Sequence, residues 1–476
     1  MSVDEGAANA YDVLEYPSLV FPHFRPERVA VAAWLHGLEP PPVATGRLLN
    51  IGGGDALDTL AFAAQWPEAY GLSFDLAAEP VARGQRWAAA GGLANVELQV
   101  LDICEAAEAL TGRFDHIQVH GVYAWVPGFV REAILPLVKA KLAPGGVAMV
   151  SFNALPGCAL RLALRELLQT ELAGVDGVVE RVERAQTVLA EVAATQPQDT
   201  EAQAALRREA RRMIDKGIHQ LGHDELGDAY HPQRFDDVAA AARAAGLKVL
   251  GDIGIGQFGR SFIDTDSGDP QAVFEAAMLR HDLVNLGFFH HLLLVHDDVA
   301  PSRRFDPARL ASLHASTVLH REGEAGFVGE HQSVEIVDPP LLAFLVDLVE
   351  ASPGHLPVDR FASDAERLGA LLRLWDADVI DLHFGAEGPY ATSVPGRPQV
   401  HPLVRALLVE GMDRPVLLDN RRAAPVDSGT MSLLMRLDGS RDHAALGAMV
   451  REMGADDPDA LAGWLAAMTR KRMFVR

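Results

Sequence analysis

The sequence contains only two cysteines, Cys104 and Cys158, among its 476 residues. Two thiols are too few for a disulfide framework or a zinc cluster, and such a composition is typical of a reducing compartment. No stretch reaches the roughly 18 uninterrupted apolar residues that a membrane helix requires, and residues 1–12 are acidic and polar, without an apolar signal segment. We therefore expect a cytoplasmic protein with no membrane insertion.

Basic residues are also few. The chain has 42 Lys and Arg against 65 Asp and Glu, which gives a formal net charge of −23. This excess of acid disfavours nonspecific binding to nucleic acid or to an anionic membrane. It favours a neutral or basic partner, and the simpler interpretation is a well-solvated acidic surface.

Short apolar runs alternate with helical segments through the first part of the chain. Between residues 47 and 153 these runs lie at 47–52, 69–76, 96–103, 114–121 and 146–153. Two later runs, 247–255 and 288–296, read as the last strands of the same sheet. Alternation of this kind predicts an α/β fold with a doubly wound parallel sheet.

The chain length and the changes in pattern predict several domains. We expect an N-terminal lid segment over 1–46, a core over 47–297 and a C-terminal domain over 308–476. Amphipathic helices over 158–225 form an insertion that either walls a substrate cleft or pairs with a second copy in a homodimer. Two C-terminal passages, "AERLGALLRLWDADVIDLHF" and "DALAGWLAAMTRKRMFVR", suggest winged-helix-like modules, which so acidic a chain does not use to bind DNA.

A glycine-rich loop follows the first predicted strand in "RLLNIGGGDALDTL". Gly52 and Gly54 fit the first two places of the dinucleotide fingerprint G-x-G-x-x-G, but its third place falls on Leu57. A bulky residue there disfavours NAD, and no lysine follows the glycines as a P-loop requires. The remaining pattern N-x-G-x-G-x-A, residues 50–56, resembles the D/E-x-G-x-G-x-G loop of class I S-adenosylmethionine (SAM) methyltransferases.

This resemblance implies a set of cofactor-binding residues. Asp75 at the end of the second strand corresponds to the acid that grips the ribose, and Asp102 at the end of the third to the acid that faces the adenine amine. The alternative is that both aspartates only cap strand ends. The candidates are Tyr16, Asn50, Gly52, Gly53, Gly54, Asp75, Leu76, Asp102, Ile103 and His120. Asn50 replaces the usual acid of the loop and Ala56 its third glycine.

The fourth strand ends in "HGVYAWVP", at the edge where ligands bind in open α/β sheets. We take His120, Tyr123 and Trp125 as candidates for the catalytic acceptor pocket. His120 would accept a proton or orient the acceptor, and the two aromatic rings would form a wall that favours a cation. The alternatives are a hydrogen-bonded strand-end histidine and a tryptophan that packs the next helix.

Other polar residues receive structural interpretations. Asn153 lies just past the fifth strand, either at the ligand or holding a loop. A metal site built from His219, His223, His231 and Asp224 is disfavoured, because helix caps or cleft contacts explain these residues better. We expect no metal.

Several longer passages resemble bacterial methyltransferases that carry a so-called regulatory domain, a group that includes rickettsial protein lysine methyltransferases acting on outer-membrane proteins. They are "YDVLEYPSLVFPHFRPERVA", "HGVYAWVP", "LAPGGVAMVSFNALPG", "LGHDELGDAYHPQRF" and "LLMRLDGSRDHAAL". The resemblance implies a Rossmann-like class I core, a helical middle region and a C-terminal domain. The sequence departs from that group at "FRP" (24–26), at Phe152 and at Cys158.

Three functions follow as hypotheses. The first is SAM-dependent N-methylation of lysine side chains in a protein or peptide acceptor, with S-adenosylhomocysteine (SAH) as product; the acidic chain suits a basic acceptor segment. The second is methylation of a small molecule or peptide natural product in a closed pocket. The third is a methyltransferase-like binding scaffold whose altered loop, Asn50 and Ala56, no longer supports catalysis.

Overall fold

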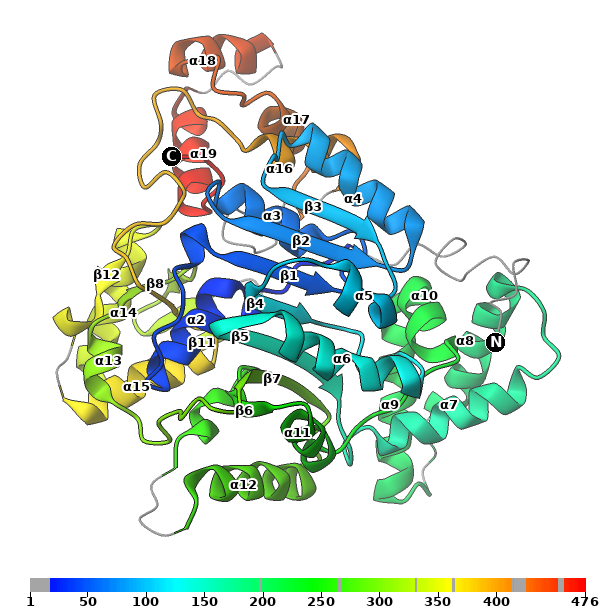
Figure 1. Ribbon diagram of the computed structural model, residues 1–476. Helices are drawn as coiled ribbons and strands as arrows, with labels where there is room; N and C mark the ends of the chain where they lie inside the picture. The colour runs from blue at the N-terminus through cyan, green and yellow to red at the C-terminus, as the bar shows by residue number, and fades with distance from the viewer. Residues whose placement is uncertain are drawn as a thin grey trace.

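A seven-stranded sheet organises the computed structural model of this chain, in the order β3-β2-β1-β4-β5-β7-β6 (Figure 1). The structure describes residues 18–194, 196, 198–263, 268–329, 332–361, 364–412, 414, 425–452 and 458–476. The strands are β1 (Arg47–Ile51), β2 (Tyr70–Asp75), β3 (Val96–Val100), β4 (Phe114–Val119), β5 (Leu142–Asn153), β6 (Leu247–Asp252) and β7 (Phe289–His296). All seven predicted strands are confirmed in one sheet.

The last strand runs against the others. β7 pairs antiparallel with both β5 and β6, whereas the pairs among β1 to β5 are parallel. Phe289, the first residue of β7, is paired with Asn153, the last of β5. β7 therefore starts at the carboxyl edge of the sheet and must run backwards, which the apolar pattern of a buried strand does not reveal.

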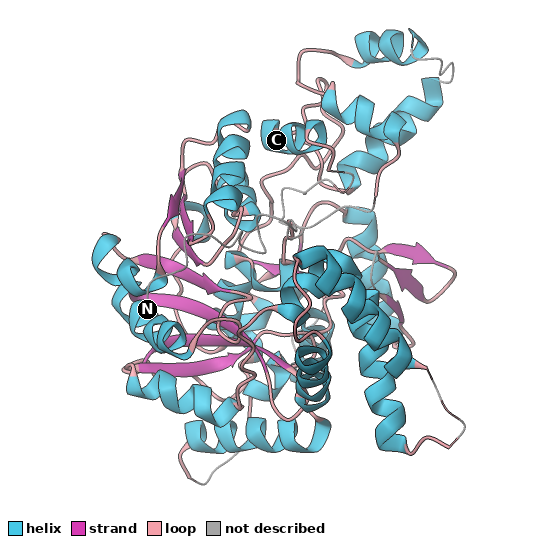
Figure 2. Ribbon diagram, turned by 90° about the vertical axis from the view of Figure 1, so that its right-hand side faces the viewer, coloured by secondary structure: helices cyan, strands magenta, loops and turns pink. Residues whose placement is uncertain are grey.

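Helices cover both faces of the sheet (Figure 2). Alternate residues along the strands point to opposite faces, so that Val150 and Leu294 join one core cluster while Met149 and Leu293 join another. The helices of this part are α2 (Pro26–Leu35), α3 (Leu57–Gln65), α4 (Ala78–Ala90), α5 (Ile103–Ala109), α6 (Gly128–Lys141), α11 (Phe235–Ala244) and α12 (Pro270–Asn285).

The predicted insertion is helical and lies beyond the carboxyl edge of the sheet (Figure 1). It consists of α7 (Ala159–Glu171), α8 (Val178–Ala193), α9 (Glu201–Asp215) and α10 (Gly217–Gln220), followed by a π-helical turn, Leu221–Glu225. These helices share an apolar cluster of their own that includes Leu168, Leu189 and Met213. A separate core lets the insertion present its other faces to the sheet edge.

The C-terminal part packs against the sheet domain in two places. Trp375 and Phe344 belong to the same core cluster as Phe24 and Met149, and Leu403 and Leu407 belong to the cluster of α3 and α4. Its helices are α13 (Pro307–Ala311), α14 (Pro339–Ala351), α15 (Ala365–Asp376), α16 (Pro402–Val409), α17 (Ser428–Met435), α18 (His443–Glu452) and α19 (Pro458–Arg470). The interpretation as two winged-helix-like modules stays a prediction.

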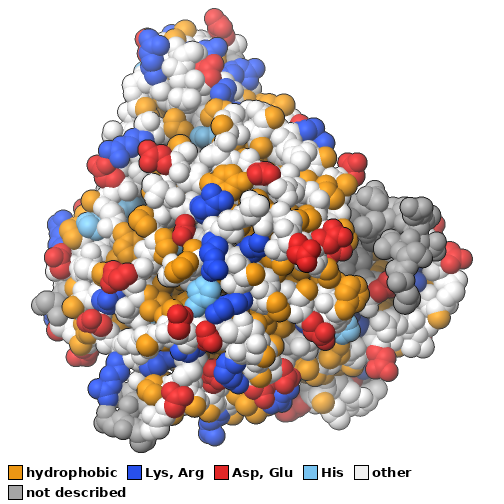
Figure 3. Space-filling view, viewed as in Figure 1, with side chains coloured by type: hydrophobic (Ala, Val, Ile, Leu, Met, Phe, Trp, Pro, Cys, Tyr) orange, Lys and Arg blue, Asp and Glu red, His pale blue; other side chains and the backbone are white. Residues whose placement is uncertain are grey.

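The C-terminal strands form two small sheets, β11-β10-β9 and β12-β8-β13. Their bounds are β8 (His314–Ser316), β9 (His320–Glu322), β10 (Gly326–Val328), β11 (Ser333–Glu335), β12 (Leu356–Pro357) and β13 (Asp381–His383). Figure 3 shows acidic and basic side chains interspersed over one face of the molecule. Within the described ranges no helix is both long enough and apolar enough to cross a membrane.

Candidate functional site

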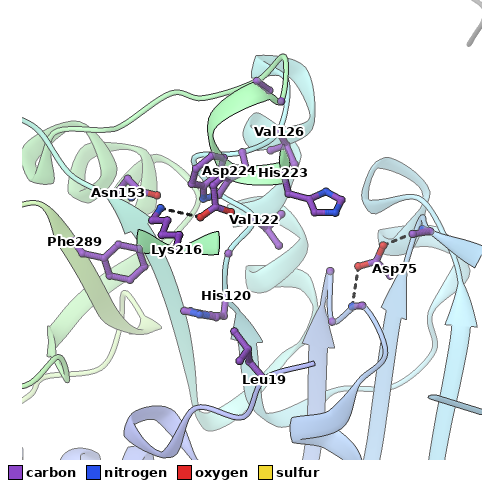
Figure 4. Close-up of a pocket in the computed structure, with 18 of the residues that line it drawn as sticks. Leu19, Asp75, His120, Val122, Val126, Asn153, Lys216, His223, Asp224 and Phe289 are labelled. Carbon is purple, nitrogen blue, oxygen red and sulfur yellow. Dashed lines mark hydrogen bonds and ion pairs between the residues drawn. The ribbon is translucent and has the colours of Figure 1, made fainter. Parts of the chain in front are cut away.

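A pocket of about 1540 Å³ lies at the carboxyl edge of the sheet. The ends of β1, β2 and β4 form its floor, residues 18–24 cover one side, and the helices of the insertion form another. Figure 4 shows Asp75 on one side of this space and Asn153, Phe289 and Lys216 on the opposite side, with His120 between them. The pocket thus joins the predicted cofactor loop to the predicted acceptor end of β4.

The glycine loop after β1 needs its glycines for two different reasons. A Cβ on Gly52 would lie 2.5 Å from Val122 Cγ2, and one on Gly53 would lie 2.2 Å from Ser73 Oγ, so these two positions are closed by packing. Gly54 has φ of +57° and open space where a Cβ would lie. A side chain there would be strained and would project beside the pocket, which leaves room for a ligand against bare backbone.

The two residues that depart from the methyltransferase loop pattern occupy defined places. Ala56 adopts the left-handed conformation with φ of 61° and is buried at the start of α3. A non-glycine residue in that conformation costs about 1–2 kcal/mol. Asn50 lines the pocket, and its Nδ2 donates to Thr59 Oγ1 at 3.2 Å. Asn50 therefore ties β1 to α3, which an acidic side chain would do equally well as an acceptor.

Two carboxylates lie at the ends of β2 and β3, as predicted, and both line the pocket. Asp75 accepts the backbone N–H groups of Gly54 and Ala77, each at 2.9 Å. Asp102 accepts Cys104 N–H at 2.8 Å and so caps α5. Asp102 thus combines helix capping with pocket lining, whereas Asp75 holds the backbone of the glycine loop and of the turn after β2.

Apolar residues follow both carboxylates in sequence. Leu76 is 70% exposed at the rim, and Ile103 lines the pocket beside Asp102. An exposed leucine beside a pocket acid supplies the kind of surface on which a flat ring packs.

His120 lines the pocket and packs against two phenylalanines that also contact each other. Its ring centroid is 4.1 Å from that of Phe21 and 4.6 Å from that of Phe24. Its Nδ1 lies 2.8 Å from Ser151 Oγ. Burial, together with the neighbouring His291 and His23, lowers the pKa of His120 to about 3. The imidazole is therefore neutral near pH 7 and a poor proton acceptor, so an orienting role suits it better than the proton-accepting one.

The structure places the two aromatic candidates differently. Trp125 lines the pocket, with its ring centroid 4.6 Å from that of Tyr230. Its ring already faces a cation, because the guanidinium of Arg161 lies 5.2 Å from its centroid. Tyr123 points away from the pocket into the sheet core, where it is 4% exposed and packs near Phe152. Tyr16 lies outside the described residues.

The N-terminal segment is held over the pocket from two sides. Ser18 contacts Asp55 by a hydrogen bond, the N–H of Phe21 donates to Asp58 Oδ1 at 3.0 Å, and Gln118 Nε2 donates to the carbonyl of Phe24 at 2.8 Å.

The other anchor of the segment is the C-terminal part. Arg25 forms a buried ion pair with Asp381, and Arg28 Nη2 donates to the carbonyl of Trp375 at 2.9 Å. Of the predicted lid, residues 1–46, the described part begins at residue 18 and is bonded both to the sheet domain and to the C-terminal part. The lid function stays a prediction.

A polar group that the strand-end reasoning missed comes from the insertion. The π-helical turn places Asp224 in the pocket wall, where its Oδ2 lies 3.0 Å from Lys216 Nζ. The same Nζ lies 2.9 Å from Glu225 Oε1, and Arg161 Nε donates to Glu225 Oε2 at 2.9 Å. Asp224 lies in the motif "LGHDELGDAYHPQRF" quoted above. The motif is far from the strands in sequence, however, so nothing local indicates that it lies in the pocket wall. π-Helical turns are frequent at functional sites.

Of the histidines weighed as metal ligands, His223 lines the pocket beside Asp224 and the other two do not. Among the described residues no group of three or more His, Cys, Asp and Glu side chains is arranged to hold a metal ion.

No family model matches the sequence. Protein RP028 of Rickettsia prowazekii is 29% identical over 242 residues, which cover 51% of this chain and 96% of that protein. Protein RP789 of the same organism is 26% identical over 248 residues, and the match spans 52% of this chain but only 45% of RP789. Their names assign neither protein a function.

The fold has a counterpart among solved structures. PKMT2 from Rickettsia typhi superimposes with a TM-score of 0.79 at 20% identity, covering 97% of this chain and 99% of PKMT2. Its complex with AdoHcy superimposes with a TM-score of 0.78 over 97% of this chain and 100% of that one. The fold is thus the class I methyltransferase sheet with helical and C-terminal additions, as expected from the sequence.

Proposed function

We propose that this protein is a SAM-dependent methyltransferase that N-methylates lysine side chains of a protein acceptor. The observation that carries the proposal is one pocket lined by the Gly52–Gly54 loop and by the carboxylates of Asp75, the last residue of β2, and Asp102, two residues after β3. The shared fold with PKMT2, which has been crystallised with AdoHcy, supports the same cofactor.

The residues present suit this cofactor. Bound SAM supplies an electrophilic methyl group on a sulfonium. The exposed backbone at Gly54 would admit its amino-acid end, Asp75 would accept from the ribose hydroxyls, and Asp102 would accept from the adenine amine. Leu76 and Ile103 would flank the adenine ring. Asp75 is already held by two backbone N–H groups, so its carboxylate is oriented before the ligand binds.

The acceptor end of the pocket suits an amine. A lysine side chain with a pKa of about 10.4 pays about 4–5 kcal/mol to lose its proton near pH 7. Asn153 Oδ1 is buried without a hydrogen-bond partner among the described residues, and Asp224 already faces an ammonium, that of Lys216. These oxygens would bind and orient the incoming amine, while Phe21, Phe24 and His120 keep water from the reacting atoms.

A protein acceptor is favoured over a small molecule by the openness of the site. The rim carries large exposed apolar side chains, with Phe288 67% and Leu286 62% exposed, and both line the pocket. Exposed apolar residues beside a pocket are typical of surfaces that another macromolecule covers.

Titration calorimetry of the full chain with SAH tests the cofactor assignment. We expect micromolar binding. Asp75→Ala removes one or two hydrogen bonds to a charged group, about 1.5–3 kcal/mol, and should weaken SAH about 10- to 150-fold. Gly54→Leu should abolish SAH binding. A leucine would strain the backbone at φ of +57°, and its side chain would fill the open space beside the pocket that the ligand needs.

Asp115→Ala is the matched control for the cofactor assignment. Its carboxylate accepts the N–H of Arg47 at 2.8 Å outside the pocket, so SAH affinity should stay within about threefold. Absence of heat and of thermal stabilisation at millimolar SAH would contradict the proposal and favour the binding scaffold. With SAH binding established, mass spectrometry of lysine-containing proteins and of free alkylamines incubated with SAM separates a protein acceptor from a small one.

A further inference from the structure

The helices of the insertion sort their charges between two sides. Residues 158–225 contain nine Lys and Arg and twelve Asp and Glu, all of which the structure describes. Five of the nine cations line the pocket, but only two of the twelve acids, Glu209 and Asp224, do so. The lining cations are Arg161, Arg181, Arg208, Arg212 and Lys216. The part of the pocket wall that this segment contributes is therefore positive, although the segment and the whole chain are acidic.

The inner and outer cations differ in how they are compensated. Lys216 and Arg161, deep in the wall, are paired with Asp224 and Glu225. On the outer turns of α9, Arg208 is exposed and forms no ion pair within the described part of the chain. Arg212 is 77% exposed and contacts Glu209 at 3.2 Å, which contributes little in water.

The third outer cation is Arg181 on α8. Within the described residues it donates to the backbone carbonyls of Leu172 and Val175, each at 3.4 Å, and forms no ion pair. Its charge is therefore not neutralised by an acid. The outer rim is formed by Arg181, Arg208 and Arg212. Against these three cations this region of the lining has the acids Glu209 and Asp228, so the rim keeps an excess of positive charge toward whatever enters the pocket.

Another part of the pocket edge is apolar. Leu160 at the start of α7 is 37% exposed, and the loop before β7 presents Leu286 and Phe288. A nucleic acid backbone gains nothing from such a surface, and the chain's net charge of −23 repels it at longer range. A polypeptide that carries both acidic and apolar side chains complements the two rims.

We propose that the acceptor lysine is presented in an acidic stretch of polypeptide, whose carboxylates are bound by Arg181, Arg208 and Arg212 at the pocket mouth. This inference rests on the proposed function and specifies its substrate class. It reverses the basic acceptor that the net charge suggests. Exposed charges act over about 8–10 Å at physiological salt, so the rim next to the acceptor decides the attraction rather than the distant surface.

The test measures peptide binding to the full chain saturated with SAH. Three fluorescein-labelled peptides share one central lysine flanked on both sides by Glu, by Gln or by Arg, and fluorescence anisotropy is recorded at low and physiological salt. The double variant Arg208→Glu/Arg212→Glu reverses the rim. The matched control Arg184→Glu/Arg211→Glu introduces the same charge change on α8 and α9 at residues that do not line the pocket.

We expect the Glu-flanked peptide to bind at least tenfold more tightly than the Arg-flanked one, with a difference that shrinks as salt rises. The rim variant should lose at least tenfold in affinity for the Glu-flanked peptide, and the control should stay within threefold. Circular dichroism and SAH affinity confirm that each variant is folded.

Three results would overturn the inference while SAH still binds. They are equal or tighter binding of the Arg-flanked peptide, an equal effect of rim and control variants, and no saturable binding of any peptide up to 1 mM. Displacement of the Glu-flanked peptide by a single-stranded oligonucleotide of equal charge would assign the rim to nucleic acid instead. Failure of SAH itself to bind would count against the proposed function, which separates the two failures.

Discussion

His290 on β7 provides a quantitative prediction about the stability of the sheet behind the pocket. Its Nδ1 lies 2.6 Å from Asp252 Oδ2 and its Nε2 lies 2.8 Å from Asp282 Oδ2. All three side chains are buried, and the hydrogen bonds and charges of the two carboxylates raise the pKa of His290 to about 9 against its burial. The histidine is therefore an imidazolium that joins β6, β7 and α12.

The magnitude follows from the pKa. A rise from 6.5 to about 9 corresponds to about 3 kcal/mol of stabilisation at 1.36 kcal/mol per unit. The same attraction lowers the pKa of Asp252, so it is counted once. Because the folded pKa lies above the unfolded one, this stability is fully present below about pH 6.5 and is lost as the pH rises through 9.

The variant His290→Gln removes the charge and leaves two buried carboxylates facing each other. Breaking a buried ion pair in this way costs about 3–5 kcal/mol, and 3 kcal/mol corresponds to about 6–12 °C in Tm for a domain of about 150–250 residues. We expect the Tm difference from the native protein to be largest at pH 6–7 and to narrow by pH 10, measured by circular dichroism at each pH.

His296→Gln is the control for this experiment. It lies on the same strand, and its Nε2 lies 3.1 Å from the backbone carbonyl of Leu142. Its Tm should stay close to that of the native protein at every pH. A Tm difference for His290→Gln that does not change between pH 6 and 10 would refute the assignment of a protonated His290.

Three further predictions concern the residues around the pocket. Asp381→Ala removes the carboxylate that contacts the buried guanidiniums of Arg25 and Arg472. It should lower the stability of the protein by about 3–5 kcal/mol and weaken SAH binding, because the N-terminal segment loses its anchor; an unchanged Tm would contradict the anchoring role. His120→Asn should lower the methyl-transfer rate without changing the shape of its pH profile between pH 6 and 9, because the pKa of His120 is about 3; loss of a titration in that range would show that His120 carries the proton. Ala56→Gly relieves the left-handed strain but raises the entropy of the unfolded chain, so it should change Tm and SAH affinity little. Ala56→Val, with a β-branched side chain at φ of 61°, should lose about 2 kcal/mol or more, and equal stability of the two variants would contradict the left-handed conformation.

The strands and the cofactor loop could be predicted because their signals are local. A run of apolar residues indicates each buried strand, and a cluster of glycines indicates a loop whose backbone approaches a ligand closely. The opposite direction of β7 carries no local signal, since a strand buried on both faces reads the same in either direction.

The acceptor end illustrates what local reasoning cannot reach. Tyr123 and Trp125 are two residues apart in one turn, yet Trp125 lines the pocket and Tyr123 enters the core. Side-chain direction in a turn depends on backbone dihedrals rather than on a fixed period. Asp224 reaches the same pocket from about a hundred residues further along the chain, through helices whose own core decides where the π-helical turn lies.

The amino-acid sequence by itself determined the seven-stranded α/β sheet, the glycine loop and the two carboxylates that follow β2 and β3, because each depends on a short stretch of residues and on which of them must be buried. Only the tertiary structure decided the charge and protonation of the site. The neutral state of His120 depends on its burial, and the positive rim depends on where the distant segments that carry Arg181, Arg208 and Arg212 lie. The cost of burying a charge and the energy between two charges are set by the surroundings in space, because they depend on distance in space rather than in sequence.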